Sequence, residues 1–296
     1  MRIINTGGRL GLLTGEGYLD VATASNGAFG ADPQAVFEQW GRFREWAAGA
    51  LAESRTGDLL PVNEADLRAP VPRPRQVFAI GVNYRDHAAE AGIDLPLEPM
   101  VFTKFPSAIT GPFDTIELPS GAVDFEAELV VVIGRTAYRV AESDAWSYVA
   151  GLTIGQDLSE RETQLRPPAP QQYNLGKSFP GFAPLGPCLV TPDEFSNPDD
   201  LEIGCSLNGE QMQKARTKEF VFSISQLVSS LSSVVQLFPG DVIFTGTPSG
   251  IGWTRTPKRL IGPGDQLTTV IEGIGHMRHR FALAAPTHPQ KGLSNV

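Results

Sequence analysis

The chain has little cysteine and no long apolar run. Only two of its 296 residues are cysteines, Cys188 and Cys205, and they form no CxxC pair, so a disulfide framework and a thiolate zinc site are excluded. No window approaches the roughly 18 consecutive apolar residues of a membrane span. The first residues also lack the apolar stretch of a signal peptide. We therefore expect a cytoplasmic protein without a membrane partner.

Positive charge is also scarce. The chain has 24 Lys and Arg against 33 Asp and Glu, a net charge of −9. Such a surface repels phosphate backbones, which argues against nucleic acid as a partner. If the substrate is an acid, its site has to supply positive charge locally.

The distribution of turn residues and apolar runs predicts a mixed α/β fold that is mainly β. Residues 1–70 predict a small N-terminal α/β domain, with a hairpin of residues 9–14 and 18–22 and a helix that begins at Asp32-Pro33. Three alternating prolines within residues 67–76 mark the boundary. Residues 71–288 form the predicted catalytic domain, and residues 289–296 form a tail. Short apolar runs there predict strands at 77–81, 129–134, 151–155, 201–207 and 242–246, with a hairpin at Asn208-Gly209 and an amphipathic helix over 224–235.

Two glutamates lie on one face of a predicted strand in VDFEAELVVVIG, residues 123–134. Because side chains alternate along a strand, Glu126 and Glu128 share a face with Val130 and Val132. Their carboxylates repel each other by roughly 1 kcal/mol or more. A bound cation would remove that repulsion. The alternative is a solvated strand end.

Asp157 follows a third apolar strand, in GLTIGQDLSERETQ. Together with the two glutamates it offers an all-oxygen ligand set, which suits Mg²⁺ or Mn²⁺, with Ca²⁺ also acceptable. The alternative is a helix N-cap, because Asp157 with Glu160 fits the capping pattern.

Other residues suggest acid–base chemistry and anion binding. His87 and Glu90 are three apart on a predicted helix, where a carboxylate beside an imidazole prepares a general base; the alternative is a surface contact. Residues 158–187 predict a long irregular loop that carries Arg161, Gln164, Arg166 and Lys177. This loop either binds an anionic substrate or is a solvated surface loop. Thr247 lies in a Gly-Thr-Pro turn that lacks the lysine of a phosphate loop.

Seven segments of the chain, in order, resemble the fumarylacetoacetate hydrolase family. They are IGVNYRDHAAEAG, MVFTKFPSAITGP, VDFEAELVVVIG, GLTIGQDLSERETQ, NLGKSF, LNGEQMQ and FPGDVIFTGTPSGIG. The resemblance implies a β-roll or sandwich core and a homodimer. It assigns the metal to Glu126, Glu128 and Asp157, a catalytic dyad to His87 and Glu90, a charge partner to Lys177, and the substrate pocket to Arg161, Gln164 and Thr247. Larger relatives use a tyrosine where this chain reads Arg166-Pro167-Pro168, so we expect a different pocket.

The resemblance and the residues together predict a small-molecule oxo-acid substrate. Our leading hypothesis is a metal-dependent hydrolase that cleaves a carbon–carbon bond in a 2,4-dioxo acid, an acylpyruvate such as fumarylpyruvate. Alternatives are a decarboxylase of an oxaloacetate-like acid and an isomerase of a hydroxymuconate-like acid. A metal-binding protein without catalysis is a further alternative.

Overall fold

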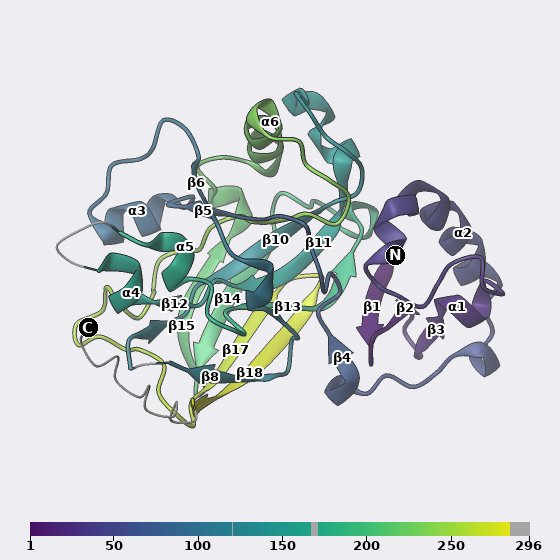
Figure 1. The fold of residues 1–296 in the computed structure, drawn as a ribbon, viewed down its shortest axis with the longest axis horizontal. Coiled ribbons are helices and arrows are strands. Elements are labelled where there is room, and N and C mark those ends of the chain that lie inside the picture. Colours follow the sequence, from purple (N-terminus) through teal and green to yellow (C-terminus); the bar gives the residue numbers. More distant parts are fainter. Residues whose placement is uncertain (120, 167–170, 285–296) are drawn as a thin grey trace, which may run out of the picture.

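A computed structural model describes residues 1–119, 121–166 and 171–284 (Figure 1). The predicted tail, residues 289–296, lies outside the described residues. The fold is mixed α/β with a majority of strands, as predicted, and it is built on two main sheets. Among the described helices, none combines the length and the apolar character needed to cross a bilayer.

The larger sheet has eleven strands in the order β3-β2-β1-β13-β11-β10-β16-β5-β6, with β4 on β1 and β7 on β13. Its central strands β10 and β11 are buried along their whole length, because near-continuous apolar runs are covered on both faces. Most neighbours are antiparallel, whereas the pairs β16–β5 and β13–β7 are parallel. The bounds are β1 (Arg2–Thr6), β2 (Arg9–Leu13), β3 (Tyr18–Asp20), β4 (Leu67–Arg68), β5 (Val77–Gly81), β6 (Met100–Thr103), β7 (Ile109–Thr110), β10 (Ala127–Ile133), β11 (Val149–Gln156), β13 (Ala183–Val190) and β16 (Val242–Phe244).

The smaller sheet has five strands in the order β15-β14-β17-β18-β8, and it packs on the central strands of the larger sheet. Its bounds are β8 (Thr115–Leu118), β14 (Glu202–Leu207), β15 (Glu210–Arg216), β17 (Gln266–Ile271) and β18 (Gly275–Leu283). The predicted hairpin at Asn208-Gly209 is confirmed, since both residues have positive φ, 53° and 83°. A third, two-stranded sheet pairs β9 (Val123–Asp124) with β12 (Ser159–Glu160).

The helices are short apart from α2 and α6. They are α1 (Val21–Ala24), α2 (Trp40–Glu53), α3 (Arg85–Ala91), α4 (Arg161–Leu165), α5 (Tyr173–Gly176) and α6 (Ile224–Val234). The 3-10 helices are η1 (Ala35–Gln39), η2 (Thr56–Asp58), η3 (Glu64–Asp66), η4 (Pro106–Ala108), η5 (Glu142–Tyr148), η6 (Pro192–Glu194) and η7 (Thr217–Glu219). The predicted amphipathic helix is confirmed as α6, which begins at a Ser223–Gln226 capping box.

Two sequence predictions of local structure are wrong. The helix signalled by Asp32-Pro33 begins only at Trp40, after η1, because the Asp32 carboxylate accepts the Gln34 N–H (3.0 Å) and closes a turn. Residues 158–187 are not one irregular loop, since their described part contains β12, α4, α5 and the start of β13. Helix α4 forms because the Glu160 side chain accepts the N–H groups of Glu162 and Thr163.

The first seventy residues contribute strands to the larger sheet. Strand β1 pairs with β13 through Arg2–Val190 and Ile3–Leu189. These N-terminal elements lie at the right of Figure 1, whereas α3, α4 and α5 gather at its left. The side chains with candidate chemistry therefore lie at the end of the molecule away from the N-terminal strands.

Candidate metal centre and active site

Three buried carboxylates meet where β10 begins and β11 ends. Strands β10 and β11 are antiparallel, with Ala127 opposite Gln156, and the Asp157 N–H donates to the Glu126 carbonyl oxygen (2.9 Å). This register places Asp157 beside Glu126. One carboxylate oxygen from each of Glu126, Glu128 and Asp157 lies within 4.8 Å of the others. Three hard oxygen donors at this spacing fit a divalent metal.

Two buried lysines contact this cluster. The Lys177 Nζ donates to Glu126 Oε2 (2.7 Å) and to Asp157 Oδ2 (2.5 Å). The Lys104 Nζ donates to the other Asp157 oxygen, Oδ1 (2.5 Å). Asp157 is therefore paired on both sides. It does not cap α4, whose N-cap is Glu160, so the helix-cap alternative is wrong, and the role of Asp157 as a metal ligand stays a prediction.

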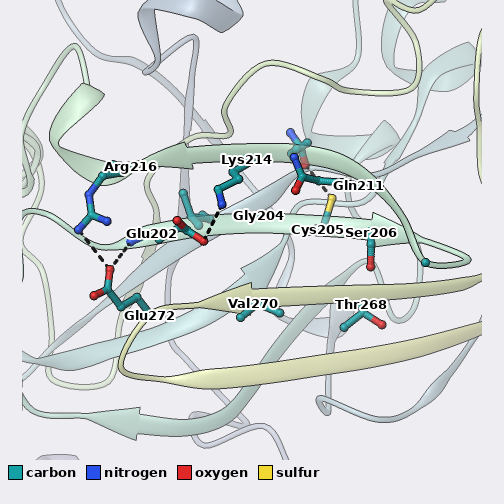
Figure 2. Close-up of a pocket in the computed structure, with 13 residues that line it drawn as sticks. Glu202, Gly204, Cys205, Ser206, Gln211, Lys214, Arg216, Thr268, Val270 and Glu272 are labelled. Atoms are coloured by element: carbon teal, nitrogen blue, oxygen red, sulfur yellow. Dashed lines mark hydrogen bonds and ion pairs between the residues drawn. The ribbon is translucent and has the colours of Figure 1, made fainter.

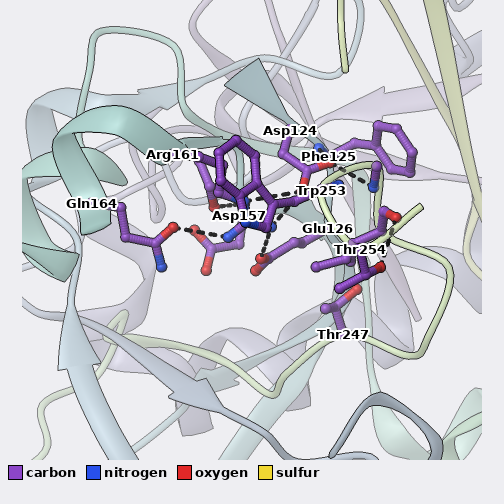
Figure 3. A network of polar contacts seen from close by, with 12 residues as sticks. Asp124, Phe125, Glu126, Asp157, Arg161, Gln164, Thr247, Trp253 and Thr254 are labelled. Carbon is purple, nitrogen blue, oxygen red and sulfur yellow. Dashed lines mark hydrogen bonds and ion pairs between the residues drawn. The ribbon is translucent and has the colours of Figure 1, made fainter. Parts of the chain in front are cut away.

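Arg161 is the third buried cation, and all its nitrogens are engaged. Its guanidinium donates to Asp124 Oδ2 (2.6 and 3.0 Å), to Glu126 Oε1 (2.7 Å) and to Gln164 Oε1 (2.8 Å). Figure 3 shows this network of polar contacts around Asp124, Glu126 and Arg161. Arg161 and Gln164 are thus held as one unit at the edge of the cluster.

The two neighbouring glutamates have opposite electrostatic environments. Burial raises the pKa of Glu128 well above its usual range, and the charges of Asp157 and Glu126 raise it further. Burial alone would also raise the pKa of Glu126, but Lys177 and Arg161 lower it below its usual range. Lys177 and Arg161 therefore stabilise the negative charge of Glu126 but leave that of Glu128 without enough positive charge nearby. A divalent cation would supply it.

The predicted His87–Glu90 pair forms on α3. The His87 Nδ1 lies 3.4 Å from Glu90 Oε2, and Glu90 also accepts the Gly250 N–H (3.0 Å). Burial works to raise the pKa of Glu90, but hydrogen bonds from His87, Thr254 and Gly250 lower it. The carboxylate is thus a fixed acceptor at Nδ1, which leaves Nε2 as the ring nitrogen available to a substrate.

One cavity of about 260 Å³ collects most of the candidate residues. Seven of the nine line it: His87, Glu126, Glu128, Arg161, Gln164, Lys177 and Thr247. The remaining two, Glu90 and Asp157, bind the lining residues His87 and Lys177 from behind. The Thr247 hydroxyl donates to the Ala127 carbonyl oxygen (2.9 Å) and accepts from Gln213 Nε2 (2.8 Å), so it is engaged in holding its turn against β10.

Sequence reasoning missed Lys104 and Asp124. Lys104, in the segment MVFTKFPSAITGP, is buried. The one sequence feature that could have indicated it is a single lysine at the end of an apolar strand. Asp124 is buried and accepts N–H groups from Gly252 (2.8 Å) and Trp253 (3.1 Å) as well as the Arg161 guanidinium. Its signal was the alternation itself, since Asp124, Glu126 and Glu128 occupy every second position.

A larger concavity of about 620 Å³ lies on the five-stranded sheet (Figure 2). Its charged side chains pair with one another at the surface, Lys214 with Glu202 (3.2 Å) and Arg216 with Glu272 (3.2 Å). None of the nine candidate residues lines it. We therefore assign the chemistry to the smaller cavity, whose charged lining residues are buried.

Comparison with known proteins gives relatives along most of the chain. A bovine (Bos taurus) protein named oxaloacetate tautomerase FAHD2A, mitochondrial, is 44% identical over 219 residues, which cover 73% of this chain and 69% of that protein. A solved Mycobacterium smegmatis structure described as HpcE is 51% identical, with a TM-score of 0.88 over 96% of this chain and 100% of that one. Maleylpyruvate hydrolase from Sphingobium sp. SYK-6, solved with manganese(II) and pyruvate, is 28% identical, with a TM-score of 0.78 over 96% of this chain and 100% of that one.

The sequence pattern described as fumarylacetoacetate (FAA) hydrolase C-terminal matches residues 76–282. This range contains all nine candidate residues and both main-sheet strands that carry the carboxylates. The resemblance seen in the seven sequence segments is thereby confirmed, and the chain belongs to the fumarylacetoacetate hydrolase family.

Proposed function

We propose that this chain is a metal-dependent enzyme that interconverts the keto and enol forms of a 2-oxo acid. The observation that carries the proposal is that His87, fixed by Glu90, lines the same small cavity as the buried carboxylates and Lys177. Tautomerisation requires a proton carrier and a stabilised oxyanion, and it requires no attacking water. The relative named oxaloacetate tautomerase supports this choice.

The residues divide the work between binding and proton transfer. A divalent metal, Mg²⁺ or Mn²⁺, held by Glu126, Glu128 and Asp157 would polarise the 2-oxo group. His87 would remove a proton from the carbon next to that group through Nε2, because Glu90 occupies Nδ1. The electron pair moves to the oxo oxygen, where the ammonium of Lys177 balances the charge, and the protonated His87 then returns its proton to that oxygen to give the enol. The reverse sequence returns the keto acid.

Hydrolysis of a carbon–carbon bond in a 2,4-dioxo acid is the second candidate, and the resemblance first favoured it. The same imidazole could take a proton from water, and the maleylpyruvate hydrolase structure shares this fold and holds manganese and pyruvate. Proteins named as oxaloacetate tautomerase, however, are 44% and 43% identical to this chain, against 28% for the maleylpyruvate hydrolase.

The test compares proton transfer with bond cleavage on the same samples. Enol-oxaloacetate and acetylpyruvate would each be mixed with the protein in Mn²⁺, Mg²⁺ or EDTA, while enol absorbance and released pyruvate are followed. We expect metal-dependent decay of the enol without pyruvate release. His87→Ala should slow the decay by about 10²–10⁴-fold, and His276→Ala, at a half-exposed histidine paired with Glu64 on the surface, should not change it. Pyruvate release from acetylpyruvate at a comparable rate would replace the tautomerase with the hydrolase.

The homodimer and the cytoplasmic location stay proposals. The bovine relative is named as mitochondrial, and that statement concerns the relative alone. Sedimentation of the purified chain would measure its oligomeric state directly, and fractionation of cells that express it would locate it.

A further inference from the structure

The cavity has a charged floor and an apolar wall. Lys177 belongs to the floor, and its Nζ lies 4.9 Å from the centroid of the Phe102 ring. The Phe102 ring in turn lies 5.9 Å from that of Tyr173. Ile93 and Trp253 continue this wall. A substrate whose oxo-acid end lies on the carboxylates and Lys177 therefore extends along aromatic and aliphatic side chains.

The described residues of the wall supply no cation for a second carboxylate. The cationic or titratable bases that line the cavity within the described part of the chain are His87, Arg161 and Lys177. Arg161 already donates to Asp124, Glu126 and Gln164 through all three of its nitrogens, and Lys177 is held between two carboxylates. A carboxylate placed against the Phe102 and Tyr173 rings would lose part of its hydration and gain no cationic partner among the described residues, which is unfavourable.

Trp253 is a fixed part of the wall. Its main-chain N–H donates to Asp124 Oδ2 (3.1 Å), and the preceding Gly252 N–H donates to Oδ1 of the same carboxylate (2.8 Å). The exposed Lys258 places its Nζ 3.0 Å from the indole centroid, which is a cation–π contact. Figure 3 shows the indole beside the Asp124–Arg161–Glu126 network. An indole anchored in this way presents a rigid surface on which a planar group can stack.

We propose that the substrate is a 2-oxo acid with a planar, apolar group on the carbon that loses the proton, and that Trp253 determines this specificity. This inference rests on the proposed function and narrows its substrate class. The enol of such an acid is conjugated and flat, so it fits along a wall of Phe102, Tyr173 and Trp253 in a cavity of only about 260 Å³.

The test uses phenylpyruvate and oxaloacetate as matched probes with the Mn²⁺-loaded full chain. We expect a higher kcat/KM for tautomerisation of phenylpyruvate than of oxaloacetate. Trp253→Ala should lower kcat/KM for phenylpyruvate by about threefold to tenfold, mainly through KM, because it removes an aromatic contact. The same variant should change kcat/KM for oxaloacetate less than twofold. Trp253→Phe should recover most of the kcat/KM lost for phenylpyruvate. Trp146→Ala, at a tryptophan that does not line the cavity, is the control.

Each other outcome overturns a defined part of the reasoning. If oxaloacetate is the better substrate, the inference is overturned while the proposed tautomerase stands. If Trp253→Ala lowers kcat/KM equally for both substrates, Trp253 does not determine specificity. If neither acid is tautomerised by the wild type, the proposed function fails and this inference fails with it. If the Trp253→Ala variant does not fold, the wild-type ratio of kcat/KM for phenylpyruvate to that for oxaloacetate still tests the substrate class. Trp253→Phe then tests the role of Trp253.

Discussion

Glu126 and Glu128 are two residues apart, yet replacing each by glutamine should destabilise the protein stripped of metal to very different extents. Glu126 accepts from Lys177 (2.7 Å) and Arg161 (2.7 Å), and these cations hold its pKa below the usual range. Glu128 accepts one main-chain N–H, from Gly246 (2.8 Å), and burial and its anionic neighbours hold its pKa well above the usual range. Without metal, Glu126 is therefore held as a carboxylate, whereas the ionised form of Glu128 is disfavoured.

The magnitudes follow from these two environments. Glu126→Gln removes one partner of a buried ion pair and should cost about 3–5 kcal/mol of unfolding free energy in EDTA. Glu128→Gln removes a carboxyl group whose charge is disfavoured and keeps an acceptor oxygen for the Gly246 N–H, so it should cost less than about 1 kcal/mol. With Mn²⁺ at 100 times its dissociation constant, the wild type should gain about 2.7 kcal/mol, and Glu128→Gln should lose most of that gain.

The assay is urea unfolding followed by tryptophan fluorescence, in EDTA and in Mn²⁺, over a range of pH. Because the folded-state pKa of Glu128 is raised, its contribution to stability is present at low pH and is lost as the pH rises through that pKa. In EDTA, the wild type should therefore lose stability as the pH rises, and the Glu128→Gln variant should not show this loss. If Glu128→Gln destabilises the EDTA-treated protein as much as Glu126→Gln does, the assigned contrast between the two environments is wrong.

Three further predictions concern single side chains. His87→Ala should lower turnover by about 10²–10⁴-fold but keep the Mn²⁺-dependent rise in melting temperature, since a general base is lost and the carboxylate cluster is intact; an equal loss of both would contradict the role of His87. Lys104→Met leaves Asp157 with one cation, so unfolding free energy in EDTA should fall by about 3 kcal/mol and Mn²⁺ should restore part of it; a deficit that Mn²⁺ leaves unchanged would argue against this pairing. Burial lowers the pKa of His279 from 6.5 to about 4, so the wild type should lose up to about 3 kcal/mol as the pH falls from 6.5 to 4. His279→Leu should flatten that pH dependence, and an unchanged slope would assign it to other groups.

Much of the local structure could be predicted from the sequence. The strand at 77–81 forms as β5, the Asn208-Gly209 turn closes a hairpin, and the amphipathic helix forms as α6. These features depend on residues close together in the chain. The exceptions also have local causes: Asp32 closes a turn before the helix can begin, and Glu160 caps a helix inside the stretch predicted to be a loop.

In the candidate site, too, the sequence predicted the contacts between residues that are close together in the chain. Alternation along one strand was enough to place Glu126 and Glu128 on a common face, and helical spacing was enough to bring His87 next to Glu90. Sequence left Asp157 undecided between a helix cap and a ligand, because both use a carboxylate at the end of a strand.

What only the tertiary structure decided is which distant charges meet. Asp157 joins Glu126 because antiparallel pairing of β10 and β11 brings the start of one strand to the end of the other. Lys104 reaches Asp157 from 53 residues away, and its burial there has no counterpart in the local pattern. The sequence by itself determined the family, the strands and the chemistry of the donor groups, since these follow from residue type and short-range spacing. The charge balance of the site, and hence the contrast between Glu126 and Glu128, was decided by folding, because electrostatic energies depend on distances and burial that exist only in the packed structure.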